Sequence, residues 1–214
     1  MKVTKEYMEW YAVLSLVYCY EKRLHMFFDC KGEEPDWQSE KLDIGMEVTE
    51  ALEPEEGRKR SVINRHFGKN QEGDIVKQQI EKSYPEYSDQ IGVVDGKAYF
   101  FESYDTPSKI NQTLDTIKSK TKKLNDHYKI FSNNWLYIFT PHLFLDSDIL
   151  QIQFDYLEYA TQFPVKFDKI FFNLQSELIV LNSGGIEKHL SISENLLIKI
   201  KAEAQLRAGH KSNE

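Results

Sequence analysis

The chain of 214 residues has little of what secreted, fibrous and membrane proteins depend on. Its two cysteines, Cys19 and Cys30, are too few for a disulfide framework or for a metal site made of cysteine alone. Ten glycines and six prolines exclude collagen-like and linker-rich architectures. No apolar run approaches the roughly 18–20 residues of a membrane span, and the N-terminal residues lack the apolar segment of a secretory signal. We therefore expect a reduced, cytoplasmic protein that does not cross a membrane.

Several familiar active-site motifs are also missing. The sequence has no P-loop, no GxGxxG and no GxSxG, and its six histidines show no metal-binding spacing such as HExxH. The formal net charge of −7 argues against a protein that coats nucleic acid by bulk charge. It leaves room for a nuclease, because a local basic patch can lie on an acidic protein.

The composition favours a well-packed interior, since 41% of the residues are hydrophobic and 13% are aromatic. Thr4 is suited to cap a first helix, whose apolar stripe recurs at helical spacing. Alternating or continuous apolar runs indicate strands. In chain order, the sequence predicts helix 4–25, strand 24–31, a strand after the turn at 33–37, strand 43–52, helices 55–67 and 72–83, a hairpin of 91–94 and 97–102, helix 107–128, strand 135–140, helix 146–163, strands 169–174 and 177–182, and helix 194–208.

This order predicts an α/β fold with a mixed central β-sheet flanked by helices. We treat residues 1–214 as a single domain, with a core of about 4–52 and 107–182. Residues 53–90 are highly charged and poor in large aliphatic side chains, which indicates a peripheral helical insertion. The helix of about 194–208 is a C-terminal extension.

The most informative stretch is residues 35–51, because it contains two acids in a predicted hairpin. If Lys41-Leu42 is a two-residue hairpin loop, Asp36 lies opposite Glu47, with the bases of the two side chains roughly 4.5–5.5 Å apart. Carboxylates that close repel each other. A site that keeps both ionised usually binds a hard divalent cation such as Mg²⁺.

Pro35-Asp36, followed by a hydrophobic strand that carries Glu47-Val48-Thr49, resembles the PD-(D/E)xK, or restriction-endonuclease-like, nuclease superfamily. The resemblance covers roughly residues 4–52 and 107–140 and implies a core of a helix, three antiparallel strands, a helix and a further strand. It also implies that Asp36 and Glu47 bind Mg²⁺ or Mn²⁺, with the Val48 carbonyl as a third ligand. Glu21 matches the acid that members of the superfamily often carry on the first helix.

One position departs from the superfamily pattern. Thr49 stands where the motif has lysine, which in the family helps to activate the attacking water and to offset charge on the phosphate. Some members supply this cation from a neighbouring helix, and here the helix 107–128 offers Lys118 and Lys122, with Lys120 and Lys123 beside them. The alternative is that these lysines form a solvated basic face. Weaker candidates for auxiliary polar roles are Gln78 and Lys82.

Two functions remain open at this point. The first is a metal-dependent nuclease, which the retention of both carboxylates favours. The second is a catalytically inactive binding or assembly module, a homo-oligomer through its aromatic surface, which Thr49 and the acidic net charge favour. The insertion also carries a basic patch, which would contact nucleic acid if the chain is a nuclease. The alternative is that nearby acids compensate its charge and that it is part of an ordinary surface helix. The patch consists of Arg58, Lys59, Arg60, Arg65, His66 and Lys69.

Overall fold

The structure, a computed structural model, describes residues 4–29, 31–51, 72–100, 106–140, 144–174 and 176–209. The chain divides into two compact units. Unit 1 comprises Met1–Ala51 and Ser108–Glu214, and unit 2 comprises Leu52–Pro107. Among the described residues, no helix has the length and apolar character of a membrane span.

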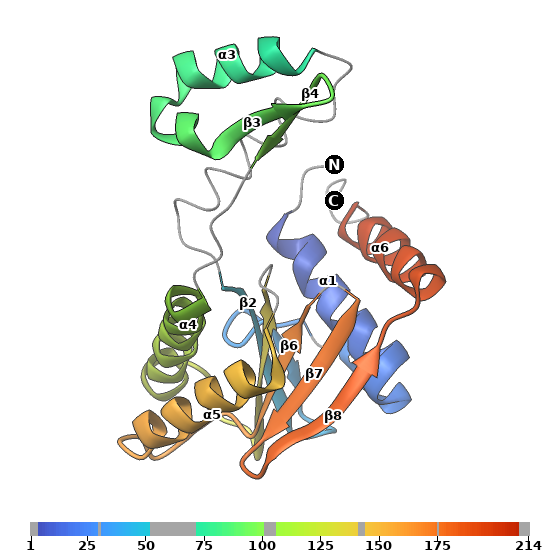
Figure 1. Ribbon diagram of the computed structural model, residues 1–214. Helices are drawn as coiled ribbons and strands as arrows, with labels where there is room; N and C mark the ends of the chain where they lie inside the picture. Colours follow the sequence, from blue (N-terminus) through green and yellow to red (C-terminus); the bar gives the residue numbers. More distant parts are fainter. Residues whose placement is uncertain are drawn as a thin grey trace. The chain divides into compact units, whose positions relative to one another are not determined.

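Unit 1 is built on a mixed six-stranded sheet with the strand order β1-β2-β5-β6-β7-β8 (Figure 1). The three central strands β2, β5 and β6 are parallel, and the outer neighbours β1, β7 and β8 pair antiparallel. The strand bounds are β1 Trp37–Ser39, β2 Ile44–Glu50, β5 Asn133–Phe139, β6 Lys169–Asn173, β7 Glu177–Asn182 and β8 Gly185–Ser191.

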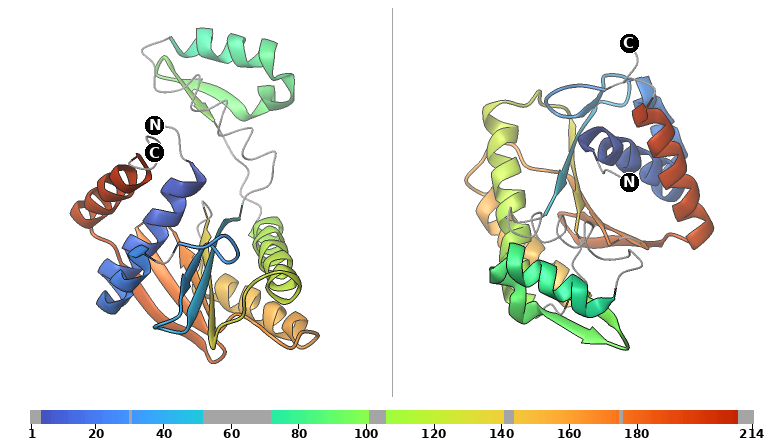
Figure 2. Two further views of the ribbon diagram at one scale, coloured as in Figure 1. Left: turned by 180° about the vertical axis from the view of Figure 1, so that it is seen from behind. Right: turned by 90° about the horizontal axis from the view of Figure 1, so that it is seen from above.

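Helices cover both faces of this sheet. Figures 1 and 2 show α1 and α6 on one face, and α4 and α5 on the other. The helix bounds are α1 Lys5–Ser15, α4 Thr106–Asp126, α5 Asp146–Ala160 and α6 Glu194–Gly209. The predicted α/β class with a mixed sheet flanked by helices is therefore confirmed.

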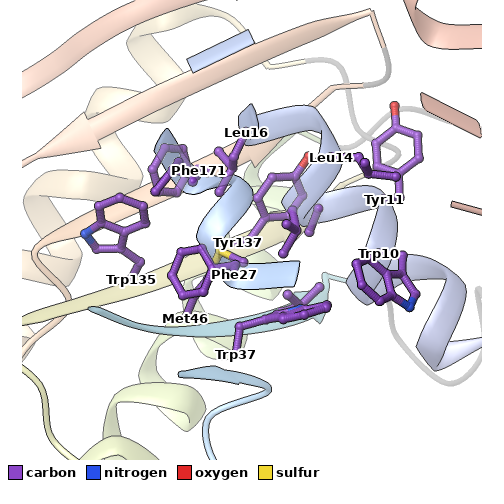
Figure 3. Packing of buried hydrophobic residues seen from close by; sticks show 14 of the residues in the cluster. Trp10, Tyr11, Leu14, Leu16, Phe27, Trp37, Met46, Trp135, Tyr137 and Phe171 are labelled. Carbon is purple, nitrogen blue, oxygen red and sulfur yellow. The ribbon is translucent and has the colours of Figure 1, made fainter. Parts of the chain in front are cut away.

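The period-2 alternation of β2 divides its side chains between the two layers. Ile44, Met46 and Val48 pack in the cluster beneath α1 and α6, as Figure 3 shows for Met46 among its aromatic neighbours. Residues at the odd positions face the other layer, where Ala51 joins the cluster beneath α4 and α5. This division matches the alternation that the sequence predicts, and it turns Glu47 toward α4.

The first helix begins as predicted and ends early. The Thr4 hydroxyl accepts a hydrogen bond from the Tyr7 N–H at 3.2 Å, which confirms the cap. After Ser15 the chain continues as a π-helical turn, η1, and then breaks where Glu21 adopts an extended backbone. The turn η1 spans Leu16–Tyr20.

The strand predicted at 24–31 is wrong. Lys22–Asp29 form a 3₁₀ helix, η2. After this helix, an isolated antiparallel bridge pairs Lys31 with Trp37 of β1. Leu24 and Phe27 are both fully buried. Residues three apart align on one side of a 3₁₀ helix, whereas in a strand they would face opposite sides.

Unit 2 contains a helix and a hairpin around a small core of its own. Its core residues are Val76, Ile80, Tyr87 and Ile91. The hairpin predicted around Asp95-Gly96 is confirmed. It belongs to unit 2, so this unit extends beyond the predicted insertion of residues 53–90. The helix predicted at 55–67 lies outside the described residues. The elements are α3 Gly73–Ser83, η3 Pro85–Gln90, β3 Ile91–Val94 and β4 Lys97–Phe100.

The sequence did not predict the edge strand β8. Its residues 185–191 include a glutamate, a lysine and a histidine and are largely half-buried or exposed. Charged residues are a common means of protecting a sheet edge from pairing with another chain. These charged residues also weaken the alternation of apolar and polar residues from which a strand is predicted.

Candidate functional site

The β1–β2 hairpin sets the position of both acids. Trp37 pairs with Met46, and continuing this register by one residue places Asp36 opposite Glu47, as predicted. The connection is longer than the predicted Lys41-Leu42 loop: residues 40–43 form the turn, with Asp43 at a φ of 51°. The register survives because the extra residues are added equally on both sides of the turn.

Gly45 allows the hairpin to pack closely at the Pro-Asp segment. A Cβ atom at this position would lie 2.5 Å from the ring of Phe131 and 3.0 Å from Pro35 Cγ. The contact with Phe131 is shorter than a Cβ atom tolerates, and the contact with Pro35 is tight, so a larger residue would first displace the Phe131 ring. The glycine therefore allows the hairpin to pack closely against Phe131 and against Pro35, the residue directly before Asp36.

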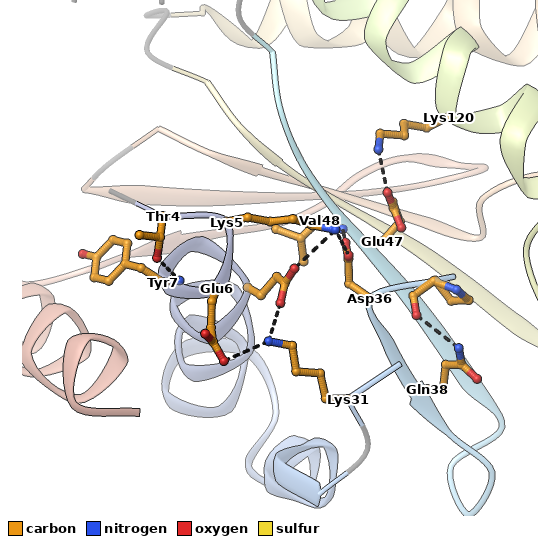
Figure 4. Close-up of polar contacts among 12 residues, drawn as sticks. Thr4, Lys5, Glu6, Tyr7, Lys31, Asp36, Gln38, Glu47, Val48 and Lys120 are labelled. Carbon is orange, nitrogen blue, oxygen red and sulfur yellow. Dashed lines mark hydrogen bonds and ion pairs between the residues drawn. The ribbon is translucent and has the colours of Figure 1, made fainter. Parts of the chain in front are cut away.

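Asp36 is 2% exposed, and each of its oxygens has a partner (Figure 4). Oδ2 accepts a hydrogen bond from the Val48 N–H at 2.9 Å. Oδ1 lies 2.9 Å from the Nζ of Lys5, which belongs to the first turn of α1. The acid thus links the edge of β2 to the helix that covers one face of the sheet.

Glu47 contacts the opposite layer. Its carboxylate is 5% exposed, and Oε1 lies 2.6 Å from the Nζ of Lys120 on α4. The Tyr128 hydroxyl donates a second hydrogen bond to this carboxylate. Asp36 and Glu47 therefore hold different cations, from α1 and α4, while remaining close enough to repel each other.

Burial raises the pKa of Glu47 above its usual value of 4.5, and the negative charge of Asp36 raises it further. Lys120 and the Tyr128 hydroxyl lower it, but they do not offset the other two effects. Burial and the neighbouring Glu47 likewise raise the pKa of Tyr128. The pKa of Glu47 therefore stays above its usual value even with Lys120 in place, mainly because the carboxyl group is buried.

This balance predicts how stability depends on pH. We expect Glu47→Gln to gain stability relative to the wild type as the pH rises from about 4.5 to the raised pKa of the folded state, because ionising the buried carboxyl disfavours folding. Urea unfolding between pH 4 and 8 measures this, with tryptophan fluorescence reporting on unit 1, which contains Trp10, Trp37 and Trp135.

The control is Glu40→Gln, which removes the same charge from a carboxylate that is 76% exposed in the turn of the same hairpin. Glu40 pairs with Lys129 at the surface, and exposed ion pairs contribute little, so the stability difference between this variant and the wild type should be small. If the wild type instead gained stability relative to Glu47→Gln as the pH rises, the stabilising ion pair of Glu47 with Lys120 would outweigh the cost of burying its charge.

The helix lysines predicted to supply the missing cation do not reach the carboxylates. Lys118 lies over the Tyr159 ring of α5, 5.4 Å from its centroid, and Lys122 is exposed. Lys120 is the lysine of this helix that reaches Glu47. The helical phase decides this, because Lys120 lies on the buried stripe between Ile117 and Leu124.

Within unit 1, the other candidates lie apart from this cluster or carry no charge. Glu21 is paired with Arg23 beyond the end of η1. Thr49, half-buried on β2, pairs with Ile138 of β5 in the sheet and follows Glu47 on the same strand face. Gln78 and Lys82 are exposed residues of α3 in unit 2, and the basic patch at 58–69 lies outside the described residues.

Sequence reasoning missed the ion pairs that α1 contributes. Glu9 is 4% exposed, and its carboxylate lies 2.8 Å from the Nζ of Lys31 and 3.5 Å from that of Lys5. Lys31 also contacts Glu6 at 3.2 Å (Figure 4). The spacing of four between Lys5 and Glu9 was the available signal. Asp36 is therefore the end of a chain of alternating charges.

Comparisons with protein-family models, curated proteins and solved structures gave no match for this chain. Within the described residues, no group of three or more histidines, cysteines and acids is placed to hold a metal ion. The site is thus a pair of buried carboxylates, each bound to a lysine.

Proposed function

We propose that the chain is a metal-dependent nuclease-like hydrolase that cleaves phosphodiester bonds in nucleic acid. The observation that supports this most is the buried contact of Lys120 with Glu47, 2.6 Å long, beside Asp36 on the same hairpin. Two carboxylates and an ammonium group are the charges that such a reaction needs. The lysine from α4 supplies the cation that Thr49 cannot.

The donors suit a hard divalent cation. Mg²⁺ prefers oxygen ligands and commonly binds one or two carboxylates while keeping several waters. Asp36 and Glu47 would hold Mg²⁺ or Mn²⁺, and such an ion would offset the repulsion between the two carboxylates, which contributes to the raised pKa of Glu47. Val48 is a candidate for a third ligand, because the N–H and C=O of one residue point to the same edge of a strand and its N–H bonds to Asp36.

When bound, such an ion would lower the pKa of its water and offset charge on the phosphate. Lys120 would stabilise the negative charge that develops on the phosphoryl oxygens. Its side chain is 18% exposed, and a charge acts more strongly in such a poorly hydrated environment than in water. Thr49 can contribute a hydrogen bond from the same face of β2 but no charge.

The test is hydrolysis of DNA and RNA, single-stranded and double-stranded, in the presence of Mg²⁺ or Mn²⁺. We expect Asp36→Asn to abolish cleavage, because it removes a carboxylate ligand, and we expect excess chelator to do the same. Glu40→Gln is the matched control and should cleave like the wild type, since Glu40 is exposed in the turn. Cleavage at the wild-type rate by Asp36→Asn would refute the assignment of this site.

A second function, a catalytically inactive binding or assembly module, is favoured by one observation. Both carboxylates already have lysine partners, so the site is close to balanced without any metal. A module of this kind would neither cleave nucleic acid nor gain stability from Mg²⁺ or Mn²⁺, because a ligand stabilises only the state that it binds. Thermal unfolding with and without these ions therefore separates the two functions.

A further inference from the structure

Lys5 lies where a cation bound to Asp36 would lie. Its Nζ is 2.9 Å from Asp36 Oδ1, while the other carboxylate oxygen accepts the Val48 N–H (Figure 4). A metal ion that binds Asp36 would therefore share Oδ1 with the ammonium group. Two cations on one carboxylate oxygen repel each other strongly in a buried environment.

The backbone dipole of α1 does not favour this placement of Lys5. The residue is in the first turn of the helix, where the backbone dipole favours negative charge and disfavours an ammonium group. Its side chain is 71% exposed, so little packing holds it in place. Two ion pairs orient it, the shorter with Asp36 at 2.9 Å and the longer with Glu9 at 3.5 Å.

The ammonium group can also leave without stranding another charge. Glu9 is the second acid beside it, at 3.5 Å, and Glu9 keeps Lys31 as a partner at 2.8 Å. The exposed stem of Lys5 allows the head group to move into water. Departure of Lys5 therefore leaves Asp36 as the acid whose charge must be balanced by something else.

We propose that Lys5 is an internal competitor for the divalent cation at Asp36 and that it moves into solvent when the metal binds. This inference rests on the metal site in the proposed function. Exchange of an ammonium group for a divalent ion raises the local charge by one, and the tethered lysine remains nearby. Both effects make the loaded site more attractive to an anionic phosphodiester.

The first test compares Mn²⁺ binding by the full-length wild type and Lys5→Met, measured by calorimetry and by electron paramagnetic resonance. We expect Lys5→Met to bind Mn²⁺ at least about fivefold more tightly, the low end of typical coupling between sites. Lys201→Met is the matched control, because it removes an exposed lysine of α6 in the same unit, and it should bind like the wild type.

The second test needs no variant. A lysine held against a carboxylate reacts slowly with acetic anhydride, so Mg²⁺ should increase the labelling rate of Lys5 in the wild type, measured by mass spectrometry of peptides. Lys201 should be unaffected, and NaCl of equal ionic strength should have a smaller effect on Lys5, since salt only screens.

The outcomes distinguish failure of the competitor role from failure of the metal site. Wild-type binding that Lys5→Met does not improve, or a Lys5 labelling rate that Mg²⁺ leaves unchanged while the metal binds, would overturn the competitor role alone. If neither the wild type nor Lys5→Met binds Mn²⁺, the proposed metal site fails, and the competitor role fails with it.

Discussion

Replacement of Lys120 with methionine is expected to lower the free energy of unfolding by about 3 kcal/mol at pH 7, because it strands a buried carboxylate. Glu47 is 5% exposed and already experiences repulsion from Asp36. When the ammonium group at 2.6 Å is removed, the Glu47 carboxylate still accepts the hydrogen bond from the Tyr128 hydroxyl but loses its ion pair. The cost is at the low end for a buried pair, since Glu47 can take up a proton instead.

A double-mutant cycle isolates this interaction. Glu47→Gln removes the stranded charge, so Lys120→Met should cost much less in the Glu47→Gln background than in the wild type. Urea unfolding followed by tryptophan fluorescence measures all four proteins. Lys122→Met is the control, because this exposed lysine is on the same helix and its loss should change stability by less than about 0.5 kcal/mol.

Additive effects of Lys120→Met and Glu47→Gln would contradict the buried pair. They would mean that the two side chains contribute independently, as exposed ion pairs commonly do. The destabilisation by Lys120→Met should also shrink as the pH falls toward 4.5, because protonation of Glu47 then removes the stranded charge.

The pairing of the two acids could be predicted from the sequence because hairpin register depends on local features. A hairpin loop centred on Lys41-Leu42 and alternating apolar residues from Ile44 onward were enough to oppose Asp36 and Glu47. An error in loop length did no harm, because it was symmetric about the turn. The α/β class followed in the same way from the order of local patterns.

The sequence of α4 contains a signal that Lys120 is the lysine that faces the sheet. Ile117 and Leu124 define the buried stripe of α4, and Lys120 is three residues after the first and four before the second. A lysine on an apolar stripe requires a buried partner or a route to water. Grouping Lys118 with Lys122 by their spacing of four identified a helix face, but not the one that meets β2.

The remaining parts of the site depend on contacts between segments far apart in the chain. Lys5 reaches Asp36, and Lys31 reaches Glu9, only after α1 has packed across the sheet edge. The 3₁₀ helix η2 was mistaken for a strand because a short apolar run fits both structures. Local pattern therefore located the carboxylates, whereas tertiary packing chose their cations.

Replacement of Trp37 with alanine is expected to cost about 4 kcal/mol of unfolding free energy, because it empties the interior beneath the shortest strand of the sheet. Trp37 is fully buried and packs edge-on against Trp10 of α1, with ring centroids 4.8 Å apart (Figure 3). Since β1 has three residues, this ring is its main anchor to the core. Loosening it also loosens Asp36, the preceding residue.

The control for Trp37→Ala is Phe154→Ala, which truncates an aromatic side chain that is 67% exposed on α5 of the same unit and should change stability by less than about 0.5 kcal/mol. Trp37→Phe should lose less than the alanine variant, because it leaves a smaller cavity. Urea unfolding detected through Trp10 and Trp135 follows unit 1 in every variant. If Trp37→Ala lowered the unfolding free energy by less than about 1 kcal/mol, β1 would be held by its backbone pairing with β2 rather than by this side chain. The position of Asp36 would then depend on the hairpin alone.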